Sequence, residues 1–225
     1  MIGNGDAIPL NALSQWAAIA AIGGYLIGSI PFGVLISHLF YGGDIRNEGS
    51  GNIGAANALR TYGAAGGVAV LVLDLLKGYA ATAFAQNAID SLWSPPFYDY
   101  ATIAGVGAVV GHCYSPWIHF RGGKGVATYL GVIFALSWVA GVVFVLIWLA
   151  VALPTRFASL GSLCAAVTSP IALGLATQDL APVIGGVGAT ALIVFRHRQN
   201  IARLRAGTEH RLQFGRGHKG DQESL

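Results

Sequence analysis

Long apolar stretches separated by short polar segments run along most of this 225-residue chain. A transmembrane helix needs about 20 predominantly apolar residues to cross the hydrocarbon core of a bilayer. Several stretches reach or approach that length, at approximately residues 14–40, 62–85, 100–114, 126–153, 160–176 and 181–195. The pattern therefore predicts an all-α fold, a polytopic membrane helix bundle, with a kink at Pro31 inside the first stretch.

The 126–153 stretch decides how many times the chain crosses the membrane. It is long enough for one tilted helix, but the segment from Ser137 to Gly141 near its middle is able to form a turn. Cytoplasmic loops of membrane proteins carry an excess of Lys and Arg. Two helices here place every Lys and Arg except Lys77 on one side, whereas one helix separates Arg156 from the other basic loops. We therefore predict seven transmembrane helices, two of them short, with the N-terminus outside and the C-terminus cytoplasmic; a single helix is the alternative.

Composition supports a single integral-membrane domain over residues 1–225. Hydrophobic residues make up 54% of the chain and charged residues only 10%, whereas soluble domains carry about 25% charged residues. Outside the C-terminal region the chain has no long basic face of the kind that binds nucleic acid. The basic segment that begins a cleavable signal peptide is also absent before the first apolar stretch. Cys113 and Cys164 form no disulfide or metal pattern, so we interpret them as buried thiols. We expect about residues 1–13 to be an external N-terminus and about 212–225 a flexible cytoplasmic tail.

One short motif between two apolar stretches, from Arg121 to Gly125, reads Arg-Gly-Gly-Lys-Gly. Glycine lets backbone N–H groups turn toward a ligand, and the two cationic side chains add charge, so the motif suits a phosphate. It is not a Walker loop, because the required spacing is absent and no strand precedes it. The alternative is an ordinary cytoplasmic turn, in which Gly, Lys and Arg are common.

A second polar segment follows the first apolar stretch and reads Ser-Gly-Asn-Ile-Gly-Ala-Ala-Asn from Ser50 to Asn57, with Arg60 one helical turn later. Its glycines free the backbone, and its Ser and Asn side chains supply short hydrogen-bonding groups. We interpret it as a loop that wraps a ligand and runs into a helix N-terminus, a natural position for an anion. The alternative is a flexible connection with an Asn helix cap.

Ionisable residues also occur inside or beside the predicted helices. Asp74 and Lys77 are one helical turn apart in an apolar run, where charged groups face a polar cavity or one another; a structural ion pair is the alternative. His112 is a candidate base, or a helix-end His bound to a backbone carbonyl. His197 and Asn200, three positions apart in the basic tail, can face the bundle and hold a phosphate or hydroxyl. The alternative for this tail is a juxtamembrane helix attracted to anionic lipid.

Three motifs occur in a fixed order between apolar spans: S-G-N-x-G-A-x-N, then G-H followed by F-R-G-G-K-G-V-A-T, then R-H-x-x-N-I-x-R-L-x-x-G-x-E. Through these three motifs, the chain from roughly residue 22 to 211 resembles the bacterial acyl-phosphate-dependent glycerol-3-phosphate acyltransferase family. The resemblance implies a multi-pass inner-membrane enzyme of seven helices whose active site faces the cytoplasm. It would move a fatty acyl group from acyl phosphate to the sn-1 hydroxyl of glycerol 3-phosphate, giving lysophosphatidic acid and phosphate in the first acylation of phospholipid synthesis.

The same resemblance bears on partners and on departures from the pattern. The expected partners are the two substrates, the lipid bilayer and, as a candidate, the enzyme that makes acyl phosphate; no cofactor, metal or nucleic acid is expected. Ala56 stands where the family usually has Thr, Ser115 occupies the usual Pro position with Pro116 one place later, and Arg211 stands where Lys is common. None of these changes removes a candidate phosphate ligand, although Ala56 affects loop hydroxyl contacts.

Residue chemistry and resemblance together define a candidate site for two phosphate-bearing substrates. The candidate catalytic residues are Ser50, Arg60, Lys124, His197 and Asn200. The candidate phosphate-binding set contains these and Gly51, Asn52, Asn57, Gly122, Gly123, Gly125, Ser159 and Ser162. The candidate supporting residues are Asp74, Lys77, His112, Thr128, Arg203 and Glu209. Arg60 and Lys124 are the first choices for phosphate charge, since Arg offers two-point contact.

Direct acyl transfer is the expected chemistry. Acyl phosphate is already activated, so the enzyme needs mainly to align the hydroxyl with the carbonyl and to stabilise the oxyanion. No Ser-His-Asp arrangement is assignable, and the H-x-x-x-x-D signature of other glycerolipid acyltransferases is absent, because His38 and Asp44 are one residue too far apart. We expect no acyl-enzyme, a substrate phosphate or His197 as the base, and an acyl chain in a groove between helices that opens to the bilayer.

Two other functions are alternatives to an acyltransferase. A membrane transporter for a small phosphate-bearing anion is supported by the Gly-rich loops and by the Asp74–Lys77 pair. Against it, the polar loops collect on one side of the membrane with no matching site opposite. A non-catalytic lipid-binding scaffold is the third interpretation.

Overall fold

The computed structural model describes residues 10–90 and 98–212. The expected flexible tail beyond residue 212, most of the expected external N-terminus, and residues 91–97 lie outside the described residues. All regular structure within them is helical. In chain order the elements are α1 (Leu10–Gly28), α2 (Phe32–Tyr41), η1 (Ile45–Asn47), α3 (Ala55–Asp90), α4 (Tyr98–Cys113), η2 (Pro116–Ile118), α5 (Val126–Leu136), α6 (Trp138–Thr155), α7 (Ala158–Thr177), α8 (Leu180–Arg196) and α9 (Arg198–Arg205).

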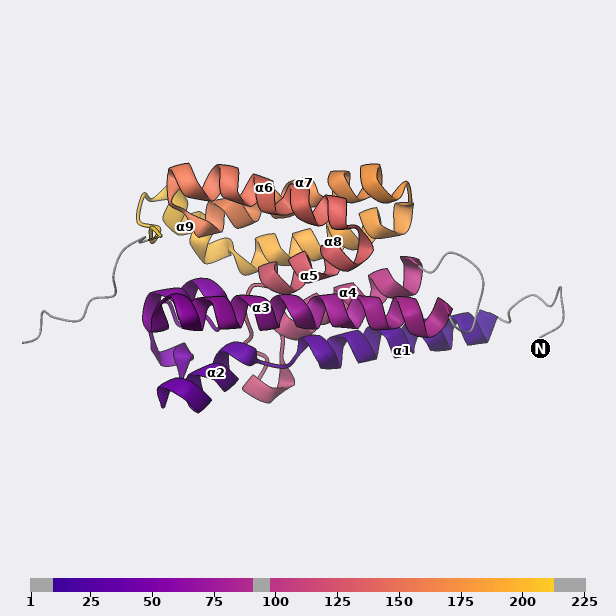
Figure 1. Cartoon of the computed structure of the whole chain (residues 1–225), viewed down its shortest axis with the longest axis horizontal. Helices are drawn as coiled ribbons and strands as arrows, with labels where there is room; N and C mark the ends of the chain where they lie inside the picture. The colour runs from indigo at the N-terminus through magenta and orange to yellow at the C-terminus, as the bar shows by residue number, and fades with distance from the viewer. Residues whose placement is uncertain (1–9, 91–97, 213–225) are drawn as a thin grey trace, which may run out of the picture.

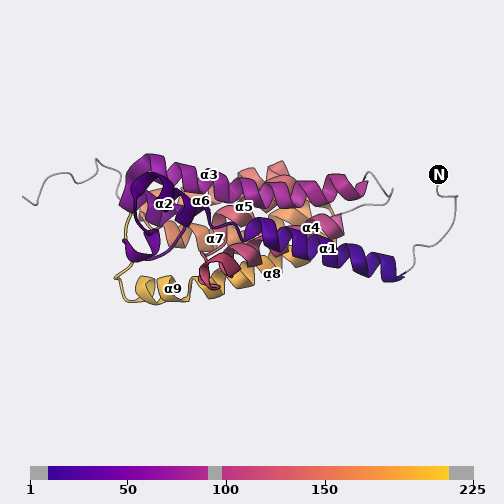
Figure 2. The ribbon, with the colours of Figure 1, turned by 90° about the horizontal axis from the view of Figure 1, so that it is seen from below.

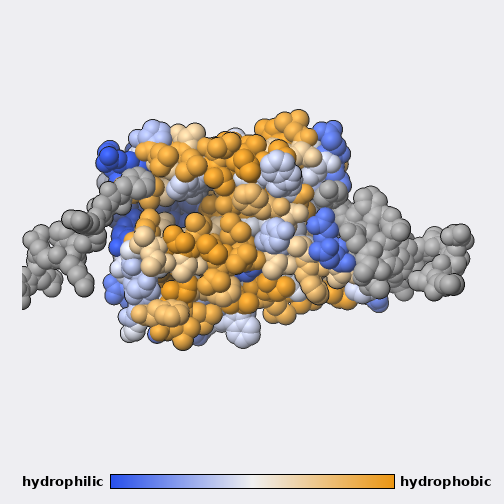
Figure 3. Space-filling view, viewed as in Figure 1, coloured by the Kyte–Doolittle hydropathy of each residue, from blue (hydrophilic) through white to orange (hydrophobic). Residues whose placement is uncertain are grey.

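Four helical stretches of the described chain are long and apolar enough to cross a membrane: residues 14–41, residues 55–88, α6 and α7. A fifth is present if α8 and α9, which meet at a bend of 58°, form one span. α4 has 16 residues and α5 has 11, so both are shorter. Figure 3 shows the surface that results, an apolar zone between two hydrophilic ends. The predicted all-α membrane bundle is confirmed, whereas helix length alone identifies four or five spans rather than seven.

The first apolar stretch breaks at Pro31, between α1 and α2, where the sequence predicts a kink. Carbonyl groups at such a break lose their helical N–H partners. Ser115 Oγ donates to the carbonyl of Ser29 at 2.6 Å, and Lys77 Nζ donates to the carbonyl of Ile30 at 2.8 Å. Irregular backbone at membrane depth is tolerated when protein groups satisfy it in this way. Ser115, a departure from the family pattern, therefore has a structural role.

The 126–153 stretch forms two helices, as predicted. Ser137 separates α5 from α6 with an extended backbone, and its side chain accepts a hydrogen bond from the backbone N of Ala140 at 3.3 Å. This bond caps the start of α6. The expectation that both helices are short is wrong for α6, which has 18 residues and continues to Thr155.

The long helix α3 begins at Ala55, earlier than the predicted span near residue 62. It contains one non-helical position, Gly63, with φ of 75° and ψ of −168°. The polar segment that ends at Asn57 therefore runs directly into the first turn of this helix. Arg60 lies on α3 as a result, and not in a preceding loop.

The helices form two groups, α1 to α4 and α6 to α9, and these groups contact each other through α4, α5 and α8 (Figure 1, Figure 2). α3 packs against α1, α2, α4 and α5, whereas α6 packs against α5 and α7, and α8 packs against α4 and α7. The largest buried cluster surrounds α5, where Tyr129 Oη and Ser169 Oγ are 2.8 Å apart and the Tyr129 ring meets Phe144 edge-on. α3 and α6 consequently lie on either side of the short helix α5.

Several polar connections of the described chain lie at one end of the bundle, the left end in Figure 1 and the polar end below, whereas the α7–α8 turn lies at the opposite end. The segment after α9 lies there beside the α6–α7 turn, because the backbone N of Leu212 donates to the carbonyl of Arg156 at 2.7 Å. The connection between α2 and α3 lies at the same end, opposite the start of α1. Motifs that are far apart in sequence thus meet in one region.

Candidate functional site

A cavity of about 410 Å³ lies at the polar end, between α3, α5, α6, α7 and the α8–α9 bend. Part of its wall is apolar and contains Leu71, Leu130, Phe144, Val145, Trp148 and Leu149. The polar part brings together most of the predicted site residues: Ser50, Asn52, Asn57, Arg60, Asp74, His112, Lys124, Gly125, Ser159, Ser162, His197, Asn200, Arg203 and Glu209. Figure 3 shows hydrophilic surface inside a recess between α6 and α3. The cavity therefore joins a cationic end to an apolar groove.

A second, more polar hollow of about 290 Å³ adjoins this cavity. The residues that line both spaces are Ser50, Asn52, Lys124, Asn200 and Arg203. The second hollow adds Gly51, Arg121, Gly122 and Arg196. Lys124 thus lies on the wall between the two spaces. The predicted residues that line neither are Lys77, Gly123 and Thr128.

Asn57 organises the loop that carries Ser50 into the site. Its side chain is buried, and its Oδ1 accepts a hydrogen bond from the backbone N of Ser50 at 2.8 Å. Its Nδ2 donates to three loop carbonyls at 2.9 to 3.2 Å, those of Ile45, Glu48 and Asn52. An Asn side chain has two N–H donors and one oxygen acceptor, and the loop engages all of them. A direct phosphate contact from Asn57, as predicted, would require one of these bonds to break.

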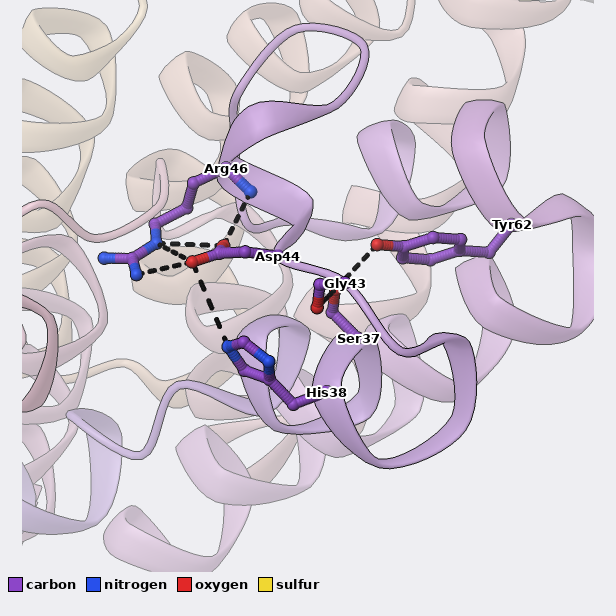
Figure 4. Close-up of polar contacts among 6 residues, drawn as sticks. All are labelled: Ser37, His38, Gly43, Asp44, Arg46 and Tyr62. Atoms are coloured by element: carbon purple, nitrogen blue, oxygen red, sulfur yellow. Dashed lines mark hydrogen bonds and ion pairs between the residues drawn. The ribbon is translucent and has the colours of Figure 1, made fainter.

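The start of the same loop is held by Asp44 (Figure 4). Its carboxylate accepts hydrogen bonds from the backbone N of Arg46 at 2.9 Å and from the guanidinium at 2.6 to 3.0 Å. The Arg46 side chain thereby lowers the pKa of Asp44 to about 2, and His38 Nε2 lies 3.9 Å from the carboxylate. Ser37 Oγ donates to the carbonyl of Gly43 at 2.7 Å. Internal bonds therefore fix both ends of the loop.

The Gly122–Gly123 pair lies directly against the end of α4. The backbone N of Gly122 donates to the carbonyl of Cys113 at 3.2 Å, and that of Gly123 donates to the carbonyl of His112 at 3.0 Å. A Cβ at either glycine would clash with His112, so glycine is needed for this close approach. Both N–H groups are used inside the protein, so neither is free in this arrangement for the phosphate contact that the motif predicts. Lys124 is the charged residue of this loop that lines the larger cavity.

The Lys124 ammonium is partly removed from water. Burial lowers the pKa of Lys124 to about 8. Glu209 attracts the ammonium and opposes this shift, while repulsion by three nearby cations adds to it, those of Arg203, Arg60 and Arg196. A bound dianion would favour the charged form of Lys124 and raise its pKa again. This electrostatic arrangement suits a phosphate.

His197 faces the cavity from the α8–α9 bend. Its side chain is buried, and its Nδ1 lies 2.8 Å from the carbonyl oxygen of Ile193. A carbonyl only accepts, so we assign the proton of the neutral ring to Nδ1, which leaves a lone pair on Nε2. The neutral ring therefore keeps one acceptor nitrogen, Nε2.

Glu209 ties three polar residues of the cavity together. Its Oε1 accepts hydrogen bonds from Asn200 Nδ2 at 2.6 Å and Ser159 Oγ at 2.8 Å, and its Oε2 accepts one from Arg203 Nε at 2.8 Å. Burial acts to raise the pKa of Glu209, but these bonds outweigh it and the pKa is lowered. The hydroxyl proton of Ser159 is used here, and that of Ser162 is used by a backbone carbonyl of its own helix. Neither serine therefore has a proton free for a phosphate in this arrangement.

Asp74, Lys77 and His112 form a buried group beside the cavity. Lys77 Nζ lies 2.7 Å and His112 Nδ1 lies 3.5 Å from the same Asp74 oxygen. The structural interpretation thus holds for Lys77, whereas Asp74 and His112 line the cavity and the His112 ring faces Asp74 instead of a backbone carbonyl. Thr128 is fully buried on α5. In the described ranges, neither this group nor any other set of His, Cys, Asp and Glu gathers the three ligands expected of a metal site.

Arg196 is a residue of the site that sequence reasoning missed. Its Nη2 donates to the carbonyl of Gly122 at 2.6 Å, and its Nε donates to the carbonyl of Gly123 at 3.0 Å. It precedes His197 in the third motif, where a basic residue at a helix end is equally typical of the membrane interface. The available signal was its place within the motif, which does not reveal a contact 73 residues back in the chain.

Sequence comparison finds relatives of this chain among known proteins. The sequence model of the family described as glycerol-3-phosphate acyltransferase matches residues 18–207. The chain is 45% identical over 204 residues to a glycerol-3-phosphate acyltransferase of Roseobacter denitrificans, and the aligned region covers 90% of this chain and 96% of that protein. It is 46% identical over 195 residues to the glycerol-3-phosphate acyltransferase of Mesorhizobium japonicum, and the aligned region covers 86% of this chain and 95% of that protein.

Two crystal structures share this fold. The chain is similar to the glycerol 3-phosphate form of PlsY (YgiH), an integral membrane glycerol 3-phosphate acyltransferase, with a TM-score of 0.80 and 40% identity over 88% of this chain and 96% of that one. The lysophosphatidic acid form gives a TM-score of 0.78 and 38% identity over 88% and 95%. Sequence and fold therefore agree over most of the chain.

Proposed function

The chain belongs to the glycerol-3-phosphate acyltransferase family, and we propose that it transfers a fatty acyl group from acyl phosphate to the sn-1 hydroxyl of glycerol 3-phosphate, giving lysophosphatidic acid and phosphate. The observation that carries this proposal is one cavity whose cationic wall continues into an apolar groove. Both substrates carry a phosphate and the donor carries a fatty chain, so the reaction needs both walls at once. The product commits glycerol 3-phosphate to phospholipid synthesis.

Arg60 and Lys124 supply the charge for the substrate phosphates in this proposal. Arg60 lies near the N-terminus of α3, where the helix dipole also favours an anion, and its planar guanidinium offers two-point contact. Lys124 lies on the wall that the two hollows share, so it is within the reach of a ligand in either. Ser50 and Asn52 line both spaces beside them and complete the polar wall.

Asn200 binds one hydroxyl of glycerol 3-phosphate and His197 serves the other, the acceptor hydroxyl, in this proposal. Glu209 binds the Asn200 amide nitrogen, so the amide oxygen is available to accept from a hydroxyl. A phosphate dianion is itself an acceptor and is a poor partner for that oxygen. His197 Nε2 or a substrate phosphate oxygen takes the hydroxyl proton.

The reaction proceeds by direct transfer in this proposal, without an acyl-enzyme. The hydroxyl oxygen of glycerol 3-phosphate bonds to the acyl carbonyl carbon, and the resulting intermediate breaks its bond to phosphate. The phosphate leaves as a stable anion, so no strong acid is required. Alignment of two bound substrates contributes most of the catalysis, an effect worth about 7–11 kcal/mol.

The acyl chain lies in the apolar groove and leaves it toward lipid. Two groove residues, Leu71 on α3 and Leu149 on α6, are 42% and 37% exposed while they also line the cavity. The groove is therefore continuous with the apolar outer surface between α3 and α6. Phe144 and Trp148 form its inner wall.

The polar end faces the cytoplasm in our proposal, in an inner-membrane protein of seven spans with its N-terminus outside. The positive-inside rule supports this orientation, because every described Lys and Arg except Lys77 belongs to the loops and helix ends of that region. α4 and α5 count as short spans, which neighbouring helices shield from lipid. The chain then acts as one domain.

A purified assay tests the function directly. Wild type reconstituted in nanodiscs should form lysophosphatidic acid from glycerol 3-phosphate with palmitoyl phosphate, and not with palmitoyl-CoA. Lys124→Ala should lower kcat/KM by at least about a hundredfold, as removal of one electrostatic group from an active site does. Arg205→Ala, which removes an exposed cation of α9, is the matched control and should keep wild-type activity.

Four outcomes would contradict parts of the proposal. Turnover with palmitoyl-CoA alone would refute the donor, and an acyl group trapped covalently on the protein would refute direct transfer. Uptake of labelled glycerol 3-phosphate into sealed vesicles without lysophosphatidic acid would favour a transporter. A Lys124→Ala protein with full activity would indicate that the cavity is not the active site.

A further inference from the structure

We propose that Arg196 is a positioning residue for this reaction, which sets the place of Lys124 by holding the carbonyl groups of Gly122 and Gly123. The inference rests on the proposed function, in which Lys124 binds a substrate phosphate. It concerns a residue that acts through the backbone of a loop and leaves the phosphate contact to another side chain.

The glycine pair is held on two opposite edges. On one edge, the N–H groups of Gly122 and Gly123 bind the carbonyls of Cys113 and His112 at the end of α4. On the other edge, the carbonyls of Gly122 and Gly123 accept hydrogen bonds from Nη2 and Nε of Arg196, at 2.6 and 3.0 Å respectively. The four hydrogen bonds fix the pair between α4 and α8, and Gly122 and Gly123 are buried.

The link from Arg196 to Lys124 runs through one peptide plane. The carbonyl of Gly123 and the backbone N of Lys124 belong to the same planar peptide unit. Fixing that carbonyl therefore fixes the direction in which the chain enters Lys124. Lys124 binds a substrate phosphate in the proposed function, so the direction of this peptide determines how well the ammonium meets that phosphate.

Arg196 is itself held in place. It is the last residue of α8, where the helix dipole favours a cation. Its guanidinium carbon lies 5.2 Å from the centre of the Tyr114 ring. The backbone carbonyl of Tyr114 accepts a hydrogen bond from Tyr25 Oη at 2.8 Å, which joins the backbone at this residue to α1. The clamp thus rests on three packed helices, α1, α4 and α8.

Arginine fits this position for geometric reasons. A planar guanidinium presents neighbouring N–H donors to two acceptors at once, whereas a lysine has a single compact ammonium at the end of a flexible side chain. If Arg196 acted only through its charge, for example on a phosphate in the second hollow that it lines, Lys would replace it well. If it acts as a clamp, Lys keeps the charge and loses the geometry.

The test compares Arg196→Lys with Arg198→Lys in purified full-length protein, with glycerol 3-phosphate as the varied substrate. Arg198 is the matched control, because it is an exposed cation two positions later whose guanidinium stacks on Phe195. We expect Arg196→Lys to raise KM for glycerol 3-phosphate by about tenfold or more with kcat changed far less. We expect Arg198→Lys to match wild type, and both variants to unfold near the wild-type temperature.

The outcomes separate this inference from its premise. Wild-type kinetics for Arg196→Lys, or an equal rise of KM in Arg198→Lys, would overturn the clamp while the proposed function stands. If Arg196→Lys fails to fold, Tyr114→Leu decides, because it removes the ring beneath the guanidinium and keeps the arginine; an unchanged KM there would also overturn the inference. Wild type that forms no lysophosphatidic acid would instead refute the proposed function.

Discussion

The side-chain amide of Asn200 donates to the carboxylate of Glu209, with Nδ2 and Oε1 2.6 Å apart. Because a carboxylate only accepts, this bond determines which end of the amide is free to meet a substrate. Glu209 reaches the site after a turn at Gly207, whose φ is 71°, and it also accepts from Ser159 at the start of α7. The chain beyond α9 thus folds back to orient a residue of α9.

Replacing Glu209 by Gln should weaken catalysis more than binding. A Gln side chain carries its own N–H donors, so it no longer fixes the orientation of the Asn200 amide. It also has one acceptor oxygen in place of two, so one of the donors that now bind Glu209 loses its acceptor. We expect kcat to fall by about ten- to a hundredfold and the free energy of unfolding to fall by about 1–3 kcal/mol. Steady-state kinetics and thermal unfolding of the purified protein measure the two effects.

The exposed carboxylate of Glu48 provides the matched control, because Glu48→Gln makes the same change on the outside of the first loop. The pH dependence gives a second check. The pKa of Glu209 is lowered in the fold, so its stabilising contribution is present above its ordinary value of 4.5 and is lost as pH falls through the lowered pKa. The stability difference between wild type and Glu209→Gln should therefore shrink in acid; a difference that grows in acid would contradict this account.

Activity should fall in mild alkali because of Lys124. Burial lowers its pKa to about 8, so the free enzyme loses this charge above about pH 8. We expect kcat/KM for glycerol 3-phosphate to decline as pH rises through that value, since kcat/KM reports groups of the free enzyme. Lys124→Arg keeps its charge over this range, and its residual activity should show no such decline.

Folding stability should respond to Lys124 in the opposite direction. A lysine whose pKa is lowered in the fold destabilises it at low pH, because the unfolded chain holds the proton more tightly. Stability should therefore rise between about pH 8 and the ordinary lysine value of 10.5, while substrate use declines. Loss of stability and activity together over this range, in wild type but not in Lys124→Arg, would assign the alkaline decline to unfolding.

Lys77→Met should destabilise the bundle strongly. The substitution leaves Asp74 without its ion-pair partner at 2.7 Å and the carbonyl of Ile30 without its donor. Breaking a buried ion pair by removing one partner costs about 3–5 kcal/mol. The double variant Asp74→Asn/Lys77→Met removes the unpaired charge and should recover part of this loss in thermal unfolding. A double variant no more stable than Lys77→Met would show that the ion pair is not the cause.

The helical architecture was predictable from sequence because lipid imposes a simple constraint. Apolar runs of sufficient length mark the helices, and Pro31 and Ser137 mark real breaks. The start of α3 was predicted too late, since the polar segment up to Arg60 reads as a loop while its last residues already form the first turn. Local polarity therefore located the site better than it located the ends of the helices.

The membership of the site was largely predictable, but the direction of its hydrogen bonds was not. Lys124 and His197 line the cavity as predicted from motif chemistry. Asn57 and Gly123 belong to the first and second motifs, yet they bind the protein itself, because their partners come from backbone groups that only the fold brings near. Arg196 has the same explanation. A motif indicates which residues gather and not which of them face the ligand.

Val145→Trp should test the acyl groove. Val145 on α6 lines the cavity, whereas Leu146, the next residue, is 59% exposed on the outer face of the same helix. An indole at Val145 would fill groove volume, and inserting bulk into packed space typically costs about 1–3 kcal/mol. We expect a higher KM for palmitoyl phosphate, a smaller change for a short-chain acyl phosphate and an unchanged KM for glycerol 3-phosphate. Leu146→Trp adds the same ring toward lipid and should keep wild-type kinetics; equal effects of the two variants would place the acyl chain outside this groove.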